Sequence, residues 1–168
     1  SLGVGGTCTI VVNFTTGATT PSGQAKGSVT VSQNGSTKTA VVTANVQSLA
    51  KLLITPSTAT FKTAVGTPSS PVTFYVGNAG DTDSAIPTVT ITGANAADFS
   101  KTDDCATSLL GGGKNKCSIV VTYSPTAVVA KASATLTVAE PGTAGASDTA
   151  ALSGEAVAPS TLVITGSV

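Results

Sequence analysis

Apolar and polar residues alternate along much of the chain, which is the pattern of strands that bury one face only. Residues 8–14 and 117–123 each place a Cys, an Ile, a Val and an aromatic residue on one side. The same alternation recurs in residues 72–76, 88–92 and 134–138, where Thr occupies much of the other side. Since no convincing amphipathic helix interrupts these segments, the pattern predicts an all-β sandwich.

Asn34-Gly35 is the strongest local signal in the chain. It separates two alternating segments, residues 27–33 and 36–46. A type I′ turn needs positive φ at both central residues, which Asn and Gly tolerate best. The pair predicts a β-hairpin at this point.

The sequence also repeats itself. Residues 8–14 (CTIVVNF) match residues 117–123 (CSIVVTY) at an offset of 109 (117 − 8), and residues 38–46 match 148–156. Residues 52–55 (LLIT) match 162–165 (LVIT) at an offset of 110 (162 − 52). A period near 110 is longer than a solenoid repeat and suits a β-sandwich domain of immunoglobulin size.

The repeat divides the chain unevenly. We expect residues 1–48 to be the C-terminal half of one immunoglobulin-like domain and residues 49–158 to be a complete domain. Residues 159–168 would be the first strand of a following repeat or a strand donated to another molecule. Because the chain contains no Met and is out of phase with its repeat, we expect a section of a tandem array, or a subunit completed by another chain.

Charged residues make up only 10% of the chain, and eight Lys balance eight Asp and Glu in the absence of His. A neutral chain without Arg lacks the positive surface that binds phosphates, so we expect no nucleic-acid partner. Without His, the usual general base and the commonest zinc ligand are missing. We therefore expect no enzyme activity, cofactor or metal, and, with no apolar run near ~18 residues, no membrane insertion in this segment.

Three cysteines carry information about pairing. Cys105 and Cys117 enclose a Gly-rich loop, and a structural disulfide there would be worth about 3 kcal/mol on a chain-entropy estimate. Cys8 would then be unpaired or would form an intermolecular bond. Disulfide bonds, whether within or between chains, indicate an oxidising compartment. Three buried thiols are the alternative, and too few ligands are present for a metal site.

Four other residue groups are candidate sites. Asp81 and Asp83 supply two carboxylates, fewer oxygens than the roughly 6–8 that Ca²⁺ requires; the adjacent pair Asp103 and Asp104 is interpreted in the same way. The others are Lys51 or Lys62 with Asn78 as an isopeptide crosslink, and Asn13 and Asn34 as N-glycosylation acceptors. Solvated turns, exposed Lys and chance motif matches explain them more simply.

With these segments aligned, the chain resembles a known family. The motifs are residues 61–80 with Asn78-Ala79-Gly80, residues 91–99, and the stretch from Cys105 to Pro125. They resemble the immunoglobulin-like repeats of the ciliary protein Hydin and of bacterial choice-of-anchor D surface proteins. Thr16 stands where the family pattern has a proline. The resemblance implies a seven- or eight-stranded sandwich, extracellular or at the cell surface of bacteria, with no catalytic residue and no set ligand.

Three functions are compatible with these features. The first is a non-catalytic structural component of an extracellular or cell-surface assembly, whose partners are copies of itself or adjacent immunoglobulin-like repeats. The second is an adhesin or carbohydrate-binding accessory domain, although Tyr75 is the only aromatic residue expected on an outward strand face. The third is an accessory domain of a secreted enzyme. In the first, residues 159–168 could add as a strand to another copy, although one strand cannot replace about fifty missing residues.

Overall fold

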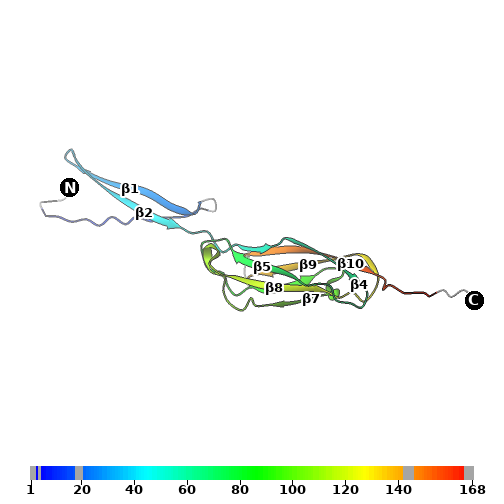
Figure 1. Ribbon diagram of the computed structural model, residues 1–168. Coiled ribbons are helices and arrows are strands. Elements are labelled where there is room, and N and C mark those ends of the chain that lie inside the picture. Colours follow the sequence, from blue (N-terminus) through cyan, green and yellow to red (C-terminus); the bar gives the residue numbers. More distant parts are fainter. Residues whose placement is uncertain (1–2, 4, 18–20, 142–145, 165–168) are drawn as a thin grey trace, which may run out of the picture. The chain divides into compact units, whose positions relative to one another are not determined.

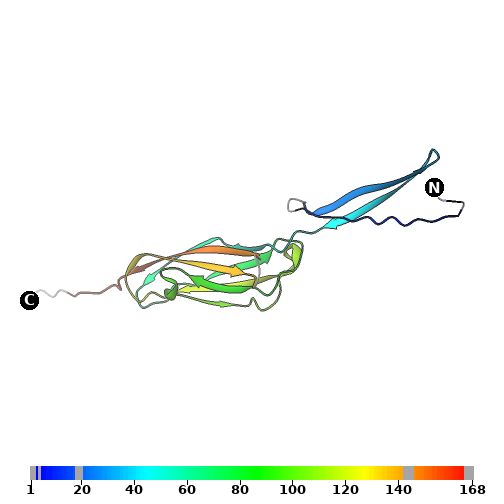
Figure 2. The ribbon, with the colours of Figure 1, turned by 180° about the vertical axis from the view of Figure 1, so that it is seen from behind.

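The computed structural model describes residues 3, 5–17, 21–141 and 146–164. The chain forms two compact units, residues 1–48 (unit 1) and 49–168 (unit 2). Both units are built from β-strands joined by loops and turns (Figures 1 and 2).

Unit 1 is built on an antiparallel β-hairpin. Strand β1 (Gly23–Gln33) pairs with β2 (Ser36–Val46) along its full length, from Gly23 opposite Val46 to Gln33 opposite Ser36. Asn34 and Gly35 have φ values of 49° and 76°, as a type I′ turn requires. The hairpin predicted from this Asn-Gly pair is confirmed.

The strand predicted at residues 8–14 is not formed. Residues 7–17 have no strand assignment, and Ile10, Val12 and Phe14 remain 51%, 50% and 52% exposed, although the pattern predicted them as core. The matching strand of unit 2, β8 (Lys116–Tyr123), is held between β5 (Val72–Asn78) and β7 (Phe99–Asp103). The described part of unit 1 contains no counterpart of β5 or β7. Residues 8–14 therefore have the alternating pattern of a strand but no neighbouring strand with which to form backbone hydrogen bonds.

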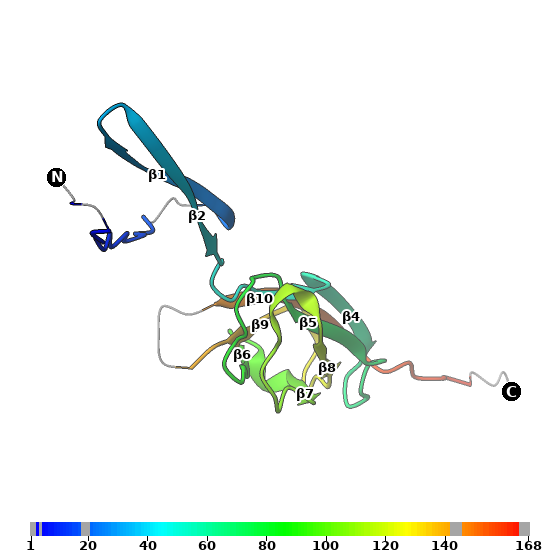
Figure 3. The same ribbon diagram turned by 90° about the vertical axis from the view of Figure 1, so that its left-hand side faces the viewer.

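Unit 2 is a sandwich of two four-stranded sheets (Figure 3). One sheet has the order β4-β10-β9-β6 and the other has the order β3-β5-β8-β7. The other strands are β3 (Leu52–Thr55), β4 (Thr58–Ala64), β6 (Thr88–Thr92), β9 (Val129–Ala139) and β10 (Ser147–Val157), with 3₁₀ turns η1 (Ala96–Asp98) and η2 (Gly111–Gly113).

The strand order is that of an immunoglobulin-like domain. Every neighbouring pair of strands is antiparallel except β4 with β10. In immunoglobulin terms, β3-β5-β8-β7 is the A-B-E-D sheet and β6-β9-β10 is the C-F-G sheet. The predicted all-β, immunoglobulin-like fold class is confirmed for unit 2.

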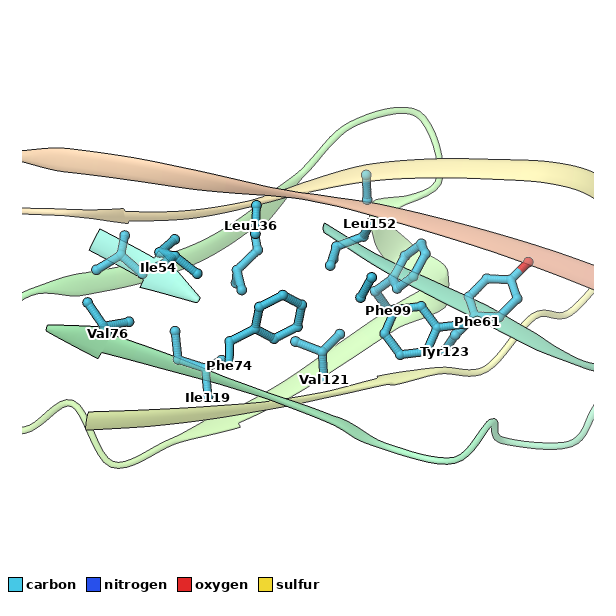
Figure 4. Close-up of a cluster of buried hydrophobic side chains, with 14 of the residues drawn as sticks. Ile54, Phe61, Phe74, Val76, Phe99, Ile119, Val121, Tyr123, Leu136 and Leu152 are labelled. Carbon is cyan, nitrogen blue, oxygen red and sulfur yellow. The ribbon is translucent and has the colours of Figure 1, made fainter. Parts of the chain in front are cut away.

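The core of unit 2 lies between the sheets (Figure 4). Phe61, Phe99 and Tyr123 form an aromatic cluster at one end, and the Phe99 and Tyr123 ring centroids are 4.8 Å apart. The apolar faces predicted for residues 117–123 and 134–138 are buried as expected. The central layer consists of Ile54, Phe74, Val76, Ile119, Val121, Leu136 and Leu152.

The chain enters and leaves unit 2 at opposite ends. Near the entrance, the backbone N–H of Ile54 donates to the Asp148 carboxylate, 2.8 Å away at the start of β10. Strands β3 and β4 then follow the direction of β10 until Ala64 lies beside Val157, where β10 ends. Nine residue steps from Asp148 to Val157 correspond to about 30 Å of extended strand.

Candidate interaction surface

Unit 1 carries an apolar groove between its hairpin and residues 10–14. It has two adjoining hollows of about 340 and 270 Å³. Val12 and Val42 line both hollows, so the two hollows meet at these residues. The first hollow is also lined by Ile10, Val29, Val31, Lys38, Thr39 and Ala40, and the second by Asn13, Phe14, Ala25, Lys26, Gly27, Thr43 and Ala44.

The residues of this groove match buried core residues of unit 2. In the sequence repeat, Ala40 aligns with Ala150. Their hairpin partners, Val29 and Leu136, therefore align as well. The counterparts of Ile10, Val12, Val31 and Val42 are Ile119, Val121, Val138 and Leu152, of which none is more than 2% exposed.

The alternation of apolar and polar residues predicted half of this surface. It indicated an inward face for residues 8–14, but it gave no link between them and Val29, Val31 and Val42 of the hairpin. The internal repeat carried the necessary signal, because it aligns both segments with strands that face one another in unit 2. A contiguous exposed apolar surface of this kind is typical of an interaction site.

The cysteines differ between the units. Cys105 and Cys117 are joined by a disulfide, with an S–S distance of 2.09 Å, between β7 and β8. Cys8, the counterpart of Cys117, is free and exposed. Asp104 places a carboxylate oxygen within 4.8 Å of both sulfurs, but disulfide sulfurs are not the thiolates that bind zinc.

Asp104 instead holds the loop beside the disulfide. Its carboxylate accepts hydrogen bonds from the backbone N–H and the hydroxyl of Ser118, the latter at 2.9 Å. These bonds favour the charged form, with the backbone N–H contributing most, and they lower the pKa of Asp104 below its ordinary value. The carboxylate therefore has a local structural contact on β8.

Asn78 is a buried junction between loops. Its side-chain oxygen accepts from the backbone N–H groups of Lys51 and Gly80, both at 2.9 Å. Its amide nitrogen donates to the carbonyls of Thr82 (2.7 Å) and Leu109 (3.0 Å). Since the amide is engaged on both atoms and Lys51 contacts it through the backbone, the arrangement favours a structural role over an isopeptide crosslink.

The acidic residues weighed for Ca²⁺ make local contacts. Asp83 accepts a hydrogen bond from the backbone N–H of Gly111 at 2.9 Å. Asp103 pairs with Lys101 at 2.8 Å. The second Lys considered for a crosslink, Lys62, pairs with Glu155 at 2.9 Å on the sandwich surface.

A shallow hollow of about 230 Å³ lies on the outer face of unit 2. Tyr75 and Leu53, respectively 52% and 50% exposed, line it together with Thr55, Gly77 and Lys116. The exposed ring of Tyr75, together with the Lys116 ammonium and the Thr55 hydroxyl, can contact a polar ligand. This hollow is the second candidate surface.

None of the described helical segments, both of them single 3₁₀ turns, is long and apolar enough to span a membrane.

Comparisons with known proteins find similarity to solved structures but no matching sequence family. No protein-family model matches it, and no curated protein matches its sequence. Among solved structures, it is similar to the ASH/PapD-like domain 7 of human CEP192, with a TM-score of 0.48 and 19% identity, covering 66% of this chain and 87% of that one. It is also similar to cadherin-like domains 1 to 4 of zebrafish RET, with a TM-score of 0.40 and 8% identity, covering 81% of this chain and 34% of that one.

Proposed function

We propose that this protein is a non-catalytic structural component of an extracellular or cell-surface assembly, in which immunoglobulin-like domains associate in series. The observation that carries the proposal is the groove of unit 1. Its apolar residues are the repeat counterparts of residues that are buried in the core of unit 2. In unit 1, however, Ile10, Val12 and Phe14 are about half exposed. Exposed apolar area of this kind favours association, because covering it removes it from water.

The surface chemistry supports a structural role. Few charged side chains are available for steering a ligand, and Thr dominates the outer strand faces. The chain enters and leaves unit 2 at opposite ends, which suits domains arranged one after another. We propose the same kind of repeat as in choice-of-anchor D and Hydin-type proteins, with adjacent repeats or copies of the chain as partners.

The disulfide supports a location outside the cytoplasm. Cys105 and Cys117 are partly protected by burial (5% and 7% exposed), and structural disulfides persist in oxidising compartments. We propose the surface of a bacterial cell as the location, in keeping with the family resemblance.

Surface labelling of the cells that produce the protein tests the proposal. Intact cells are treated with a membrane-impermeant amine reagent, and the protein is then isolated under thiol-blocking conditions. We expect labelled Lys residues, an intact Cys105–Cys117 bond and recovery in a high-mass fraction. Recovery from the cytosol with both thiols blocked would contradict the proposal.

The hollow at Tyr75 favours a second candidate function, the binding of a carbohydrate. A sugar ring would stack on the exposed face of Tyr75, with Lys116 and Thr55 as hydrogen-bond donors. A glycan array compares the wild-type chain with Tyr75→Ala. Binding that is lost in the variant would support this function, and an array without signal would remove it.

A further inference from the structure

Strand β6 is an open edge of the sheet that also contains β9 and β10 (Figure 3). It pairs with β9 on one side, and no described strand pairs with its other side. Thr88, Thr90 and Thr92 are exposed on the outer face, whereas Val89 and Ile91 are only partly buried on the core side. An edge strand of this kind presents backbone groups with which another strand can pair.

The open backbone groups of β6 belong to Val89 and Ile91. The backbone N–H of Glu140 donates to the carbonyl of Ala146 at 3.0 Å, in continuation of the ladder between β9 and β10. Consecutive residues of a central strand bond alternately to its two neighbours, so the odd-numbered residues of β9 bond to β6. Their register partners are the three threonines of β6. The N–H and C=O groups of Val89 and Ile91 therefore point away from β9, toward the open side.

The other edges of the two sheets are protected against strand addition. On β3, the N–H of Ile54 donates to the Asp148 carboxylate, and β4 carries the exposed Lys62. On β7, Lys101 and Asp103 form an ion pair at 2.8 Å on the side of the strand that faces the core. Edge lysines and inward-pointing charges are known protections of sheet edges. Strand β6 contains no charged residue, so among the four edges of the described sandwich it is the one that lacks this protection.

The sequence of β6 fits a second copy of the same strand. Thr-Val-Thr-Ile-Thr has the same pattern in both directions about Thr90. In an antiparallel pair centred on Thr90, Thr88 lies opposite Thr92, and Val89 lies opposite Ile91. Threonines then face each other on the outer side and β-branched aliphatic side chains face each other on the core side, and both are favourable cross-strand pairs.

The same register joins the open backbone groups. Because Val89 and Ile91 both direct their N–H and C=O groups outward, Val89 of each copy exchanges both of its hydrogen bonds with Ile91 of the other. Thr90 is then opposite Thr90 in the closely spaced, non-hydrogen-bonded position. Side-chain pattern and backbone direction thus agree on one register.

We infer that β6 of one chain pairs with β6 of a second chain, antiparallel and with Thr90 opposite Thr90. This contact goes beyond the proposed function, because it uses an edge of unit 2 and not the groove of unit 1. A two-fold axis at Thr90 relates the two copies, as in other isologous dimers. The two four-stranded sheets become one sheet with β4 at each edge. Because Lys62 on β4 opposes further strand addition, the association stops at the dimer.

Sedimentation velocity of the purified full chain over a range of concentrations tests the inference. A Cys8→Ser background removes the free thiol, and we expect a monomer–dimer equilibrium. Thr90→Lys places two ammonium groups opposite each other and should raise the concentration for half-dimerisation at least about tenfold. Thr73→Lys makes the same change at an exposed position on β5. It is the matched control and should dimerise like the parent chain.

A charge-reversal mixture identifies the symmetry of the contact. Thr90→Glu alone should weaken the dimer as Thr90→Lys does. An equal mixture of the two variants should dimerise at a lower concentration than either variant alone, because opposite charges then face each other across the two-fold axis. Recovery in the mixture also shows that both variants are folded.

Cysteine trapping tests the register. Cα atoms of a non-hydrogen-bonded pair lie about 4.5 Å apart, which is within the range of disulfides. In the Cys8→Ser background, Thr90→Cys should give a covalent dimer with glutathione disulfide as oxidant, which is reduced to two glutathione thiols as one interchain disulfide forms. Thr88→Cys is the control on the same face, because it lies opposite Thr92 and about 13 Å from Thr88 of the other copy.

Three outcomes would overturn the inference. They are a parent chain that stays monomeric at every concentration, a dimer that Thr90→Lys does not weaken, and cross-linking of Thr88→Cys as readily as Thr90→Cys. These outcomes are separate from those of surface labelling. A surface-exposed, high-mass protein whose purified chain does not pair through β6 would remove the inference and leave the proposed function standing. A cytosolic protein that pairs through β6 would do the reverse.

Discussion

Gly154 on β10 lies directly against the ring of Tyr123 on β8. A Cβ atom at position 154 would be 2.6 Å from the ring atom Cζ, closer than real Cβ contacts allow. Tyr123 is fully buried and is held by Phe61 and Phe99. The ring thus has little room to move away, and the close approach of the two sheets at this point depends on the absence of a side chain.

Gly154→Ala should lower the free energy of unfolding of unit 2 by about 1–3 kcal/mol, the usual cost of overpacking a core. Urea denaturation measures the change. Gly77→Ala on β5 is the control, since its Cβ would meet only the flexible Lys116 side chain at 3.7 Å. Equal effects of the two substitutions would contradict the close packing at Tyr123.

Tyr123→Phe should leave the stability at neutral pH unchanged or increase it. The Tyr123 hydroxyl is buried without a hydrogen-bond partner among the described residues, and such a group is costly. The matching residue of unit 1 is Phe14. A loss of more than about 1 kcal/mol in urea denaturation would indicate a partner for the hydroxyl.

The same residue predicts an alkaline transition. Burial, and to a lesser degree Asp98, raises the pKa of Tyr123 above its ordinary value of 10.0. The folded state therefore favours the neutral phenol, so this contribution to stability is fully present below pH 10 and is lost as the pH rises through the raised pKa. Thermal melts at increasing pH should show the loss in the wild type and in Tyr75→Phe, but a smaller loss in Tyr123→Phe.

Asn78→Ala should destabilise unit 2 by about 1–3 kcal/mol or more, because it leaves several backbone groups without their partners. Denaturant unfolding again gives the measurement. Asn95→Ala is a suitable comparison, since Asn95 accepts one exposed hydrogen bond from the Ser133 N–H. If both variants lose the same amount, the junction at Asn78 contributes less than its contacts indicate.

Removal of the disulfide by Cys105→Ser/Cys117→Ser should cost about 3 kcal/mol on the chain-entropy estimate. Replacing both cysteines avoids a buried unpaired thiol. Reduction of the wild-type protein should shift its melt in the same direction, whereas Cys8→Ser should not shift it, because Cys8 is free and exposed. A melt of the double variant that matches the oxidised protein would show that the bond contributes little.

Much of unit 2 could be predicted from local pattern. Alternation identified the buried faces of β8 and β9, because each of these strands has one face on the core and one face in solvent. Asn34-Gly35 identified the hairpin of unit 1, because its turn conformation depends on only two residues. Asn78 drew attention in the sequence only as part of a family motif and as a crosslink candidate. Its hydrogen bonds to Lys51 and Leu109, 27 and 31 residues away, had no local signal.

The prediction for residues 8–14 was wrong for a related reason. The segment has the same alternation as β8, and by sequence alone the two are equivalent. A strand, however, is defined by its neighbours. Strand β8 lies between β5 and β7, and residues 8–14 have no such neighbours in the described part of unit 1.

The sequence by itself determined the fold class, the hairpin and the internal repeat, because these depend on residue type and on spacing along the chain. Tertiary structure decided which of two nearly identical apolar faces is buried. In unit 2, Ile119 and Val121 are covered by the opposite sheet, whereas in unit 1 their counterparts, Ile10 and Val12, line an open groove. The free energy of burial belongs to the contact and not to the residue, so only the arrangement of neighbouring strands could locate this surface.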